Sequence, residues 1–368
     1  MYQLIFGIAL AFFYFSEKTE KKIVKWTLVM MALLLPSWLA GVRDFTIGSD
    51  VLLYGKGWFE RACSYDSLVS FMNKANEYSI GIGYATVNYL VSRMTHNFHV
   101  FLFVYQFIQV CIVYLAVKPL EKEISITFAF FVYFFCYYNM SLNILRQIMA
   151  VMIVLFGYRY VLKHNLFKFL LTIVVAYTFH SSAIIGLALY PINWALNNKS
   201  LKKISRIAII VGSLGAAIGY QGLLYIFSKM GVLSLERYLH YLSDTDVGGR
   251  YVRLIYWVII LALIIWRGKK CIRNNEKSLT LEMYMIMSGI LSVIAFLGST
   301  WIVRIAYYFD VYQIVFLPIL VQNLPFSLGK KKNKGGYLLI GILLIAFWIF
   351  NYVIRNGANT YPYIFMRN

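Results

Sequence analysis

Long uninterrupted apolar runs restrict what this chain can fold into more than any other feature of its sequence. Clear examples are residues 98–117, 124–140, 205–227 and 337–354. A helix needs roughly 17–25 apolar residues to cross a bilayer core of about 30 Å, so each run predicts a transmembrane helix. The runs lack the polar and apolar alternation of a lipid-facing barrel strand. Because lipid offers the backbone no hydrogen-bond partners, the sequence predicts an all-α, polytopic integral membrane protein.

Composition supports this fold class and indicates one membrane domain. Of the 368 residues, 61% are hydrophobic and only 14% are charged, whereas soluble domains average about 45–50% apolar and about 25% charged residues. The chain shows no internal repeat, linker or low-complexity tract, so we expect a single membrane-embedded domain over residues 1–368. Lysines follow the first apolar run, 1–16, rather than precede it, which favours a retained first helix over a signal peptide.

The net charge of +20 comes from lysine and arginine clusters that separate the apolar runs. These clusters form no continuous basic face, so they indicate membrane topology, and no nucleic acid is expected as a partner. Under the positive-inside rule they all lie in the cytoplasm, and an even number of crossings separates each from the next. They occur at 18–25, 118–122, 163–168, 199–206, 267–277 and 330–334. The expected fold is a helical bundle of about 10–12 transmembrane segments with both termini outside.

One interval between basic clusters cannot hold two full spans. Between Lys168 and Lys199 there is a single apolar stretch, residues 169–195, which polar residues interrupt around His180. Non-helical backbone at membrane depth occurs only where it is buried in protein or lines a wet cavity. The sequence therefore predicts a broken or re-entrant segment near residue 180, which is also a candidate site.

An alternative topology lets residues 81–94 cross the membrane and residues 169–195 cross once. It places Arg93 and Arg146 inside but moves two of the basic clusters outside. The charge rule favours the first topology.

The first topology makes the polar loops 43–79 and 228–250 external, and the first of them begins with candidate ligands. An arginine fork can bind a phosphate bidentately, and carboxylates can accept sugar hydroxyls or a proton. The alternative interpretation is a solvated loop with a snorkelling arginine. The candidates in this loop are Arg43, Asp44, Asp50, Tyr54 and Glu77.

Two further candidate groups lie in apolar surroundings. Asn143, Arg146 and Gln147 are spaced to share one helical face, and an arginine at membrane depth is costly unless it is paired or faces a cavity. His180 is a candidate general base, proton shuttle or donor to phosphate. The alternative for His180 is a histidine whose hydrogen bonds are satisfied by a neighbour.

The last third of the sequence adds Arg304 with Tyr308 near the start of a span, and Arg250 near the start of another. Asp310 lies deeper in the Arg304 span, where it needs water, a cavity or a structural ion pair with another helix. Arg250 has membrane-edge anchoring as its alternative. No metal is predicted, because His96 and His99 lack an identifiable third ligand. Arginines gathered with His180 at the outer leaflet suit a pyrophosphate whose lipid tail stays in the membrane.

Several short motifs resemble those of the EpsG family of exopolysaccharide and capsule proteins, which are similar to Wzy-type polymerases. The resemblance covers essentially the whole chain in order. It rests on Gly41-Val42-Arg43-Asp44, Gly48-Ser49-Asp50 with Tyr54, Glu77 with Gly83-Tyr84 and Asn88, Asn143 with Leu145-Arg146-Gln147 and Ala150, Phe179-His180-Ser181-Ser182-Ala183, and Arg304 with Tyr308-Phe309.

The resemblance implies a bacterial polysaccharide polymerase for exopolysaccharide, capsule or O-antigen. Such a membrane glycosyltransferase joins undecaprenyl-pyrophosphate-linked oligosaccharide repeats, which serve as donor and acceptor, at the outer face of the cytoplasmic membrane. It implies no cofactor, and it makes a chain-length regulator and a flippase candidate partners besides membrane lipid. The chain lacks the single very large external loop of many Wzy proteins, which leaves the acceptor site unassigned.

The mechanism expected from these residues is glycosyl transfer that expels polyprenyl pyrophosphate. Arginines would stabilise the leaving charge without a metal, and a base would take the proton of the attacking hydroxyl. The arginines are Arg146, Arg43 and Arg304, with Arg250, Gln147 and Tyr308 as further ligands. The base candidates are His180 and Asp44, with Asp50 and Glu77 behind them. The rival functions are a flippase for lipid-linked oligosaccharide and a membrane acyltransferase that modifies the polymer.

Overall fold

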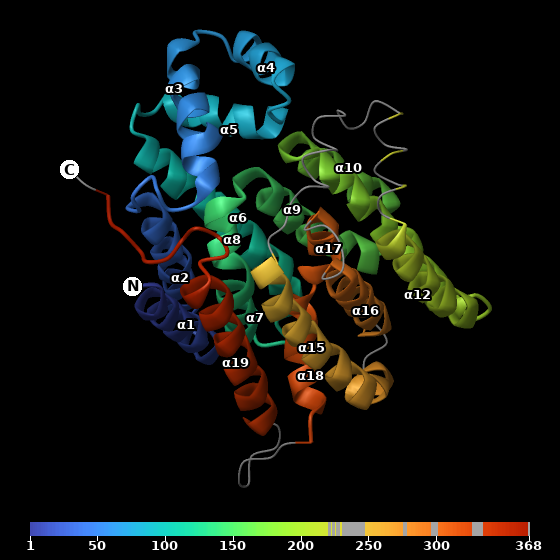
Figure 1. The fold of residues 1–368 in the computed structure, drawn as a ribbon. Helices are drawn as coiled ribbons and strands as arrows, with labels where there is room; N and C mark the ends of the chain where they lie inside the picture. Colours follow the sequence, from blue (N-terminus) through green and yellow to red (C-terminus); the bar gives the residue numbers. More distant parts are fainter. Residues whose placement is uncertain are drawn as a thin grey trace. The chain divides into compact units, whose positions relative to one another are not determined.

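The computed structural model of the protein is built from helices (Figure 1). It describes residues 1–219, 247–274, 278–295, 301–325 and 334–366, with positions 222, 225 and 229 between the first two ranges. The chain divides into two compact units, which are described separately. The first unit comprises Met1–Gly186 with Tyr352–Asn368, and the second comprises Leu187–Asn351. That the whole chain acts as one membrane domain stays a prediction.

The first unit combines long apolar helices with short ones. Polar side chains fix where several helices begin: Asn97, Ser125 and Asn165 each accept a hydrogen bond from a backbone N–H in the first turn. Its helices are α1 (Tyr2–Lys18), α2 (Lys22–Gly41), the π-helix η1 (Val51–Gly55), α3 (Lys56–Ser64), α4 (Leu68–Glu77), α5 (Ile82–Ser92), α6 (Phe98–Val117), η2 (Lys118–Leu120), α7 (Ile126–Tyr133), the π-helix η3 (Phe134–Tyr138), α8 (Asn139–Asn143), α9 (Leu145–Leu162), α10 (Leu166–Phe179) and the 3₁₀-helix η4 (Ser181–Ala188).

The second unit starts within η4 and is also helical where it is described. Its helices are α11 (Leu189–Asn197), α12 (Lys202–Ile218), α15 (Val247–Asn274), α16 (Ser278–Ala295), α17 (Trp301–Asp310), α18 (Gln313–Asn323) and α19 (Lys334–Trp348), with η5 (Ile349–Ile354) leading back into the first unit. The expected external loop 228–250 lies largely outside the described residues.

These helices confirm an all-α, polytopic membrane protein. Within the described residues, four helices are long and apolar enough to cross a bilayer: Lys22–Gly41, Phe98–Leu120, Leu145–Leu162 and Lys334–Ile354. A bent pair, Val303–Asp310 with Gln313–Asn323, adds a fifth candidate with a 57° bend. Other apolar runs form shorter helices or contain a change of helix type, as where η3 separates α7 from α8. The count of about 10–12 spans therefore stays a prediction.

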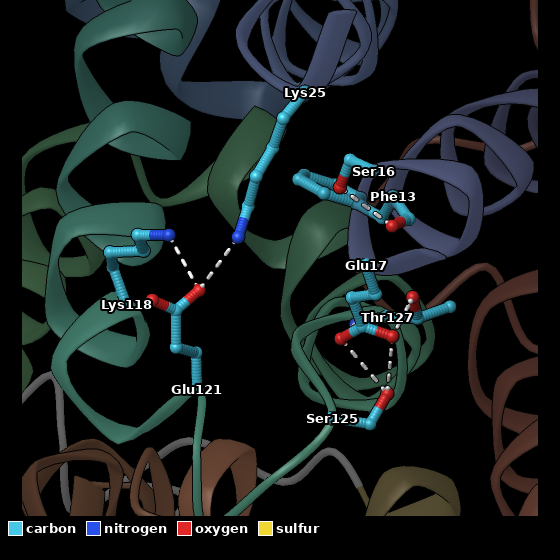
Figure 2. A network of polar contacts seen from close by, with 8 residues as sticks. All are labelled: Phe13, Ser16, Glu17, Lys25, Lys118, Glu121, Ser125 and Thr127. Carbon is cyan, nitrogen blue, oxygen red and sulfur yellow. Dashed lines mark hydrogen bonds and ion pairs between the residues drawn. The ribbon is translucent and has the colours of Figure 1, made fainter. Parts of the chain in front are cut away.

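Polar contacts bring the first two basic clusters to one end of the first unit (Figure 2). Glu121 accepts hydrogen bonds from Lys25 at 3.2 Å and from Lys118 at 2.5 Å. Beside them, Glu17 at the end of α1 accepts a hydrogen bond from Ser125 at the start of α7. We call this the basic end.

The third cluster lies at the same end, because Arg159 in the last turn of α9 donates to the carbonyl of Leu115 near the end of α6. The 18 residues of α9 correspond to about 27 Å of helix. Arg146, in the first turn of α9, therefore lies at the opposite end, which we call the polar end. There the Gly41 carbonyl at the end of α2 lies 2.8 Å from Nδ1 of His99 in the first turn of α6.

Helix α5 begins and ends near the polar end. A Cβ atom on Gly81 would lie 2.3 Å from the carbonyl oxygen of Thr178, so the start of α5 packs closely against the last turn of α10. After α5 only residues 93–97 separate it from the start of α6. This arrangement matches the first topology and not the alternative, which requires residues 81–94 to cross.

Candidate functional site

The loop after α2 has a fixed backbone at the polar end. Asp44 Oδ1 accepts hydrogen bonds from the backbone N–H of Thr46 at 3.0 Å and from its hydroxyl at 2.6 Å, which is an Asx turn. Gly48 has φ +86°, and a Cβ atom there would lie 2.2 Å from the carbonyl oxygen of Leu142. Only glycine fits this close approach and this backbone conformation.

A helix break lies just before Arg146. The expectation that Asn143, Arg146 and Gln147 share one helical face is wrong, because α8 ends at Asn143 and α9 begins at Leu145. Ile144 between them has φ −93° and ψ 70°, outside the helical range. Spacing along the sequence assumed a continuous helix and could not reveal this break.

The loop after α2 supplies the hydrogen bonds that the broken helix lacks. The carbonyl oxygen of the Asn143 side chain accepts from the backbone N–H and the hydroxyl of Ser49, at 2.8 and 2.7 Å. Asp50 Oδ2 accepts from the backbone N–H of Leu145 at 3.2 Å, where a carboxylate is favoured by the positive end of α9. Asp50 thus holds the first turn of α9 and is not simply a solvated charge.

Arg146 has few partners for its guanidinium group. Its Nη1 donates to the carbonyl of Ser79 at 3.1 Å, and its Cζ lies 4.6 Å from the centre of the Tyr54 ring, a cation–π contact. Tyr54 in turn donates to Asp50, and burial, followed by the charge of Asp50, raises the pKa of Tyr54 well above its ordinary value. Arg146 Nε is buried and has no hydrogen-bond partner among the described residues.

The break predicted near residue 180 is confirmed. Helix α10 ends at Phe179, and His180 is extended, with φ −155° and ψ 128°. Its Nδ1 lies 2.6 Å from the Ser182 hydroxyl and accepts from the Ser182 backbone N–H at 3.3 Å. Gln147 donates to the same hydroxyl at 3.4 Å. This chain of contacts connects His180 to the first turn of α9, where Arg146 lies.

Arg43 is the most unusual charged residue of the first unit, because it is only 1% exposed. Its Nε and Nη1 atoms have no hydrogen-bond partner within the described part of the chain. The groups that interact with its charge there are tyrosine hydroxyls rather than carboxylates: Tyr138, Tyr2, Tyr363 and Tyr84. Burial lowers the pKa of this guanidinium from its ordinary value, although an arginine side chain stays protonated in proteins.

The Tyr84 hydroxyl interacts electrostatically with both Arg43 and Arg146. It also interacts with the Asn88 side chain and with Asp50. Tyr84 is fully buried, and no group among the described residues meets its hydroxyl with full hydrogen-bond geometry. Sequence reasoning noted Tyr84 only as part of a motif and did not predict it as a site residue. The only available signal was that motif, because nothing in the spacing shows that the hydroxyl faces charged groups.

The remaining candidates are Glu77 in the first unit and three residues on helices of the second unit. Glu77 forms an exposed ion pair with Lys74 at 2.7 Å, and no hydrogen bond joins its side chain to this cluster within the described part of the chain. Arg304 is exposed and Tyr308 is buried, both on α17 of the second unit. Arg250 lies in the first turn of α15, but its side chain is outside the described residues.

A second arginine cluster, which is partly buried, lies within the second unit, and its arginine is paired with a carboxylate. Arg253 on α15 bonds Asp310 at 2.5 Å and Ser292 at 3.2 Å. Gln313 donates to the other oxygen of Asp310 and accepts from Tyr256. Of the interpretations open for Asp310, the structural ion pair with another helix is the one observed.

No group of three or more His, Cys, Asp or Glu residues in the described ranges could hold a metal ion. The first unit instead presents a polar cluster of arginine, tyrosine, carboxylate and histidine at one end of a bundle of apolar helices. Such an arrangement can bind an anionic group and stabilise negative charge that develops on it.

The fold and this cluster define a polytopic membrane protein with a cationic polar site at one end of its first unit. The EpsG family model matches residues 26–365, and the chain belongs to the EpsG family. It is accordingly an exopolysaccharide-related, polymerase-like membrane protein. No curated protein and no solved structure matches the chain.

Proposed function

We propose that this protein is a polysaccharide polymerase, a membrane glycosyltransferase that joins undecaprenyl-pyrophosphate-linked oligosaccharide repeats. Membership of the EpsG family supports the general class. The observation that carries the specific proposal is the set of buried donors without partners at the polar end: Arg43 Nε and Nη1, Arg146 Nε and the Tyr84 hydroxyl. Buried donors that remain unpaired cost roughly 1–3 kcal/mol each. We assign these donors to a bound anion, because the Tyr84 hydroxyl interacts electrostatically with both arginines.

The anion is the pyrophosphate of the lipid-linked donor. In the reaction, the oxygen of an acceptor sugar hydroxyl forms a bond to the anomeric carbon of the donor sugar, and the bond from that carbon to the pyrophosphate oxygen breaks. The bonding electrons leave with the polyprenyl pyrophosphate, whose growing charge Arg146, Arg43 and Tyr84 stabilise. The hydroxyl proton passes to a base.

Of the two leading base candidates, the contacts favour Asp44. Because Nδ1 of His180 accepts the Ser182 N–H, the neutral imidazole carries its proton on Nε2, which makes it a hydrogen-bond donor rather than a base. Asp44 is a carboxylate, which only accepts, and Thr46 holds it in one orientation through two hydrogen bonds. We therefore assign proton transfer to Asp44 and a stabilising hydrogen bond to His180.

The proposed site faces the outside of the bacterial cytoplasmic membrane. Two observations support this orientation: the three basic clusters of the first unit share the end opposite Arg146, and basic clusters are typical of the cytoplasmic side. The outer face also gives the polar end access to the lipid-linked repeat, whose hydrocarbon tail would remain in the bilayer.

A direct test gives purified protein in lipid nanodiscs a synthetic polyprenyl-pyrophosphate-linked repeat unit. Growth of longer lipid-linked chains, with release of polyprenyl pyrophosphate, is the expected result. Movement of the lipid between leaflets of a proteoliposome without chain growth would instead identify a flippase. Transfer of an acyl group from an added acyl donor would identify an acyltransferase. Either of these outcomes, without elongation, would contradict the proposal.

A further inference from the structure

A cavity of about 350 Å³ lies at the polar end of the first unit and has no role in the pyrophosphate site described above. One side is formed by the loop after α2, including Thr46 and Ser49. The other side is formed by the last part of the chain, which we call the tail segment (residues 356–366), including Asn356, Asn359 and Tyr361. The volume is within the usual range of about 300–1,000 Å³ for small-molecule sites.

Backbone hydrogen bonds hold the tail segment against this loop on both sides of the cavity. The N–H of Gly48 donates to the carbonyl of Asn359 at 2.7 Å, and the N–H of Asp44 donates to the carbonyl of Ile364 at 2.9 Å. An isolated antiparallel bridge also joins Arg43 to the tail segment. The cavity walls are thus fixed by main-chain contacts and do not depend on long flexible side chains.

The chemistry of the lining favours a neutral ligand that is rich in hydroxyl groups. Hydroxyl and amide side chains alternate with apolar ones, and no charged side chain lines the cavity. Asn359 is exposed and Tyr361 is 36% exposed, and neither side chain donates or accepts a hydrogen bond within the described residues. An amide can bind sugar hydroxyls, and the face of a tyrosine ring can cover the apolar face of a sugar.

One residue that lines the cavity is hydrogen-bonded to the proposed base. Thr46 lines it, and the hydroxyl of Thr46 donates to Asp44 at 2.6 Å. A sugar hydroxyl that reached the Thr46 side of the cavity would therefore approach the carboxylate that takes its proton. The pyrophosphate donors, in contrast, are guanidinium and phenol groups that do not line the cavity.

We infer that the cavity between the loop after α2 and the tail segment binds an uncharged sugar of the acceptor oligosaccharide. This inference rests on the proposed polymerase function and adds the acceptor subsite to it. Asn359 and Tyr361 supply binding contacts, and the loop presents the attacking hydroxyl to Asp44.

Two variants of the tail segment test the subsite. Asn359→Gly removes the amide while tolerating the positive φ of 51° at this position, and Tyr361→Leu removes the aromatic ring. Phe365→Leu is the matched control, because Phe365 is another exposed aromatic residue of the tail segment but does not line the cavity. Equal thermal unfolding midpoints in nanodiscs establish that the compared variants are folded.

The probe is the oligosaccharide repeat released from its lipid carrier by mild acid, taken from the strain that produces the protein. Saturation-transfer NMR against protein in nanodiscs measures its binding. Wild type, Arg146→Ala and Phe365→Leu should bind alike, because the probe carries no pyrophosphate. Asn359→Gly and Tyr361→Leu should each weaken binding about tenfold, as expected for loss of one hydrogen bond or stacking contact.

Unchanged binding by both cavity variants would overturn the subsite, as would absence of binding to the wild type or an equal loss in Arg146→Ala. The elongation assay separates this failure from that of the proposed function. If the wild type extends lipid-linked repeats while both cavity variants bind the probe normally, the polymerase stands and the subsite falls. If the cavity variants lose the probe but the wild type never elongates, the subsite stands and the polymerase falls.

Discussion

Two arginine clusters, one around Arg253 in the second unit and one at the polar end of the first, satisfy their nitrogen donors in opposite ways. In the second unit, Arg253 is paired with one carboxylate oxygen of Asp310, and Gln313 donates a hydrogen bond to the other oxygen. In the first unit, Arg43 and Arg146 both have buried nitrogen atoms without a hydrogen-bond partner in the described residues. Both kinds of residue look alike in the sequence, as single arginines near apolar runs.

This difference separates a structural role from a binding role. In a buried ion pair each charge is compensated by its partner, so no ligand is needed. Removal of one partner leaves the other charge buried and uncompensated, which destabilises the protein. Buried donors without partners destabilise the empty protein and are stabilised by an anion. Substitutions in the two clusters should therefore affect different quantities: stability in the second unit and activity in the first.

The largest effect is expected for Arg146. Arg146→Ala should reduce chain elongation by at least about 100-fold, because it removes a preorganised donor to the leaving pyrophosphate. Arg146→Lys should also be strongly impaired, since lysine lacks the planar fork. The measurement is polymer length on gels after growth, with membrane protein level from immunoblots. Arg61→Ala, which removes an exposed arginine stacked on Trp58, is the control; normal chain length in Arg146→Ala would sink the assignment.

Next in size is the effect of breaking the Arg253–Asp310 pair. Asp310→Leu or Arg253→Met alone should cost about 3–5 kcal/mol of stability, because one charge is left buried without its partner. The double variant should recover most of that loss. Thermal unfolding in detergent measures all four proteins of the cycle. If the two single losses of stability add in the double variant, Arg253 and Asp310 do not stabilise each other, and the ion-pair interpretation is wrong.

A smaller effect is expected at Gly48. Gly48→Ala places a Cβ 2.2 Å from the carbonyl oxygen of Leu142 at a positive φ, so a strain of about 1–3 kcal/mol should displace the loop. Elongation should fall more than the amount of folded protein. Gly57→Ala is the matched control, because a Cβ there meets nothing within 4 Å. Equal activity of the two variants would show that the loop tolerates displacement.

The smallest effect is expected for Tyr84. Tyr84→Phe removes only a hydroxyl whose partner is absent among the described residues, so stability should be unchanged or slightly higher. Elongation should fall about tenfold, the value of one hydrogen bond to a charged group. The readout is the ratio of initial elongation rate to folded protein. Full activity in Tyr84→Phe would remove this hydroxyl from the pyrophosphate site.

Much of the site could be predicted from the sequence because its members stand out locally. Arg146, His180 and Gly48 interrupt apolar or helical patterns, and the break after Phe179 follows from a stretch too short for two spans. Glu77 was assigned to the site although its i,i+3 spacing from Lys74 is the local pattern of an ion pair on a helix surface, which is what α4 shows. The helix break at Ile144 could not be predicted, because the residues that stabilise it, Ser49 and Asp50, lie far away in the sequence.

Hydropathy and the order of basic clusters by themselves determined that this chain is an all-helical membrane protein. Both are local properties, since a span depends on a run of apolar residues and a loop on its own charges. The tertiary structure alone decided which arginine is paired with Asp310, that Tyr84 interacts with both Arg43 and Arg146, and that the tail segment forms one side of a cavity. These are contacts between segments distant in the chain, and they depend on how helices pack and not on spacing within one helix.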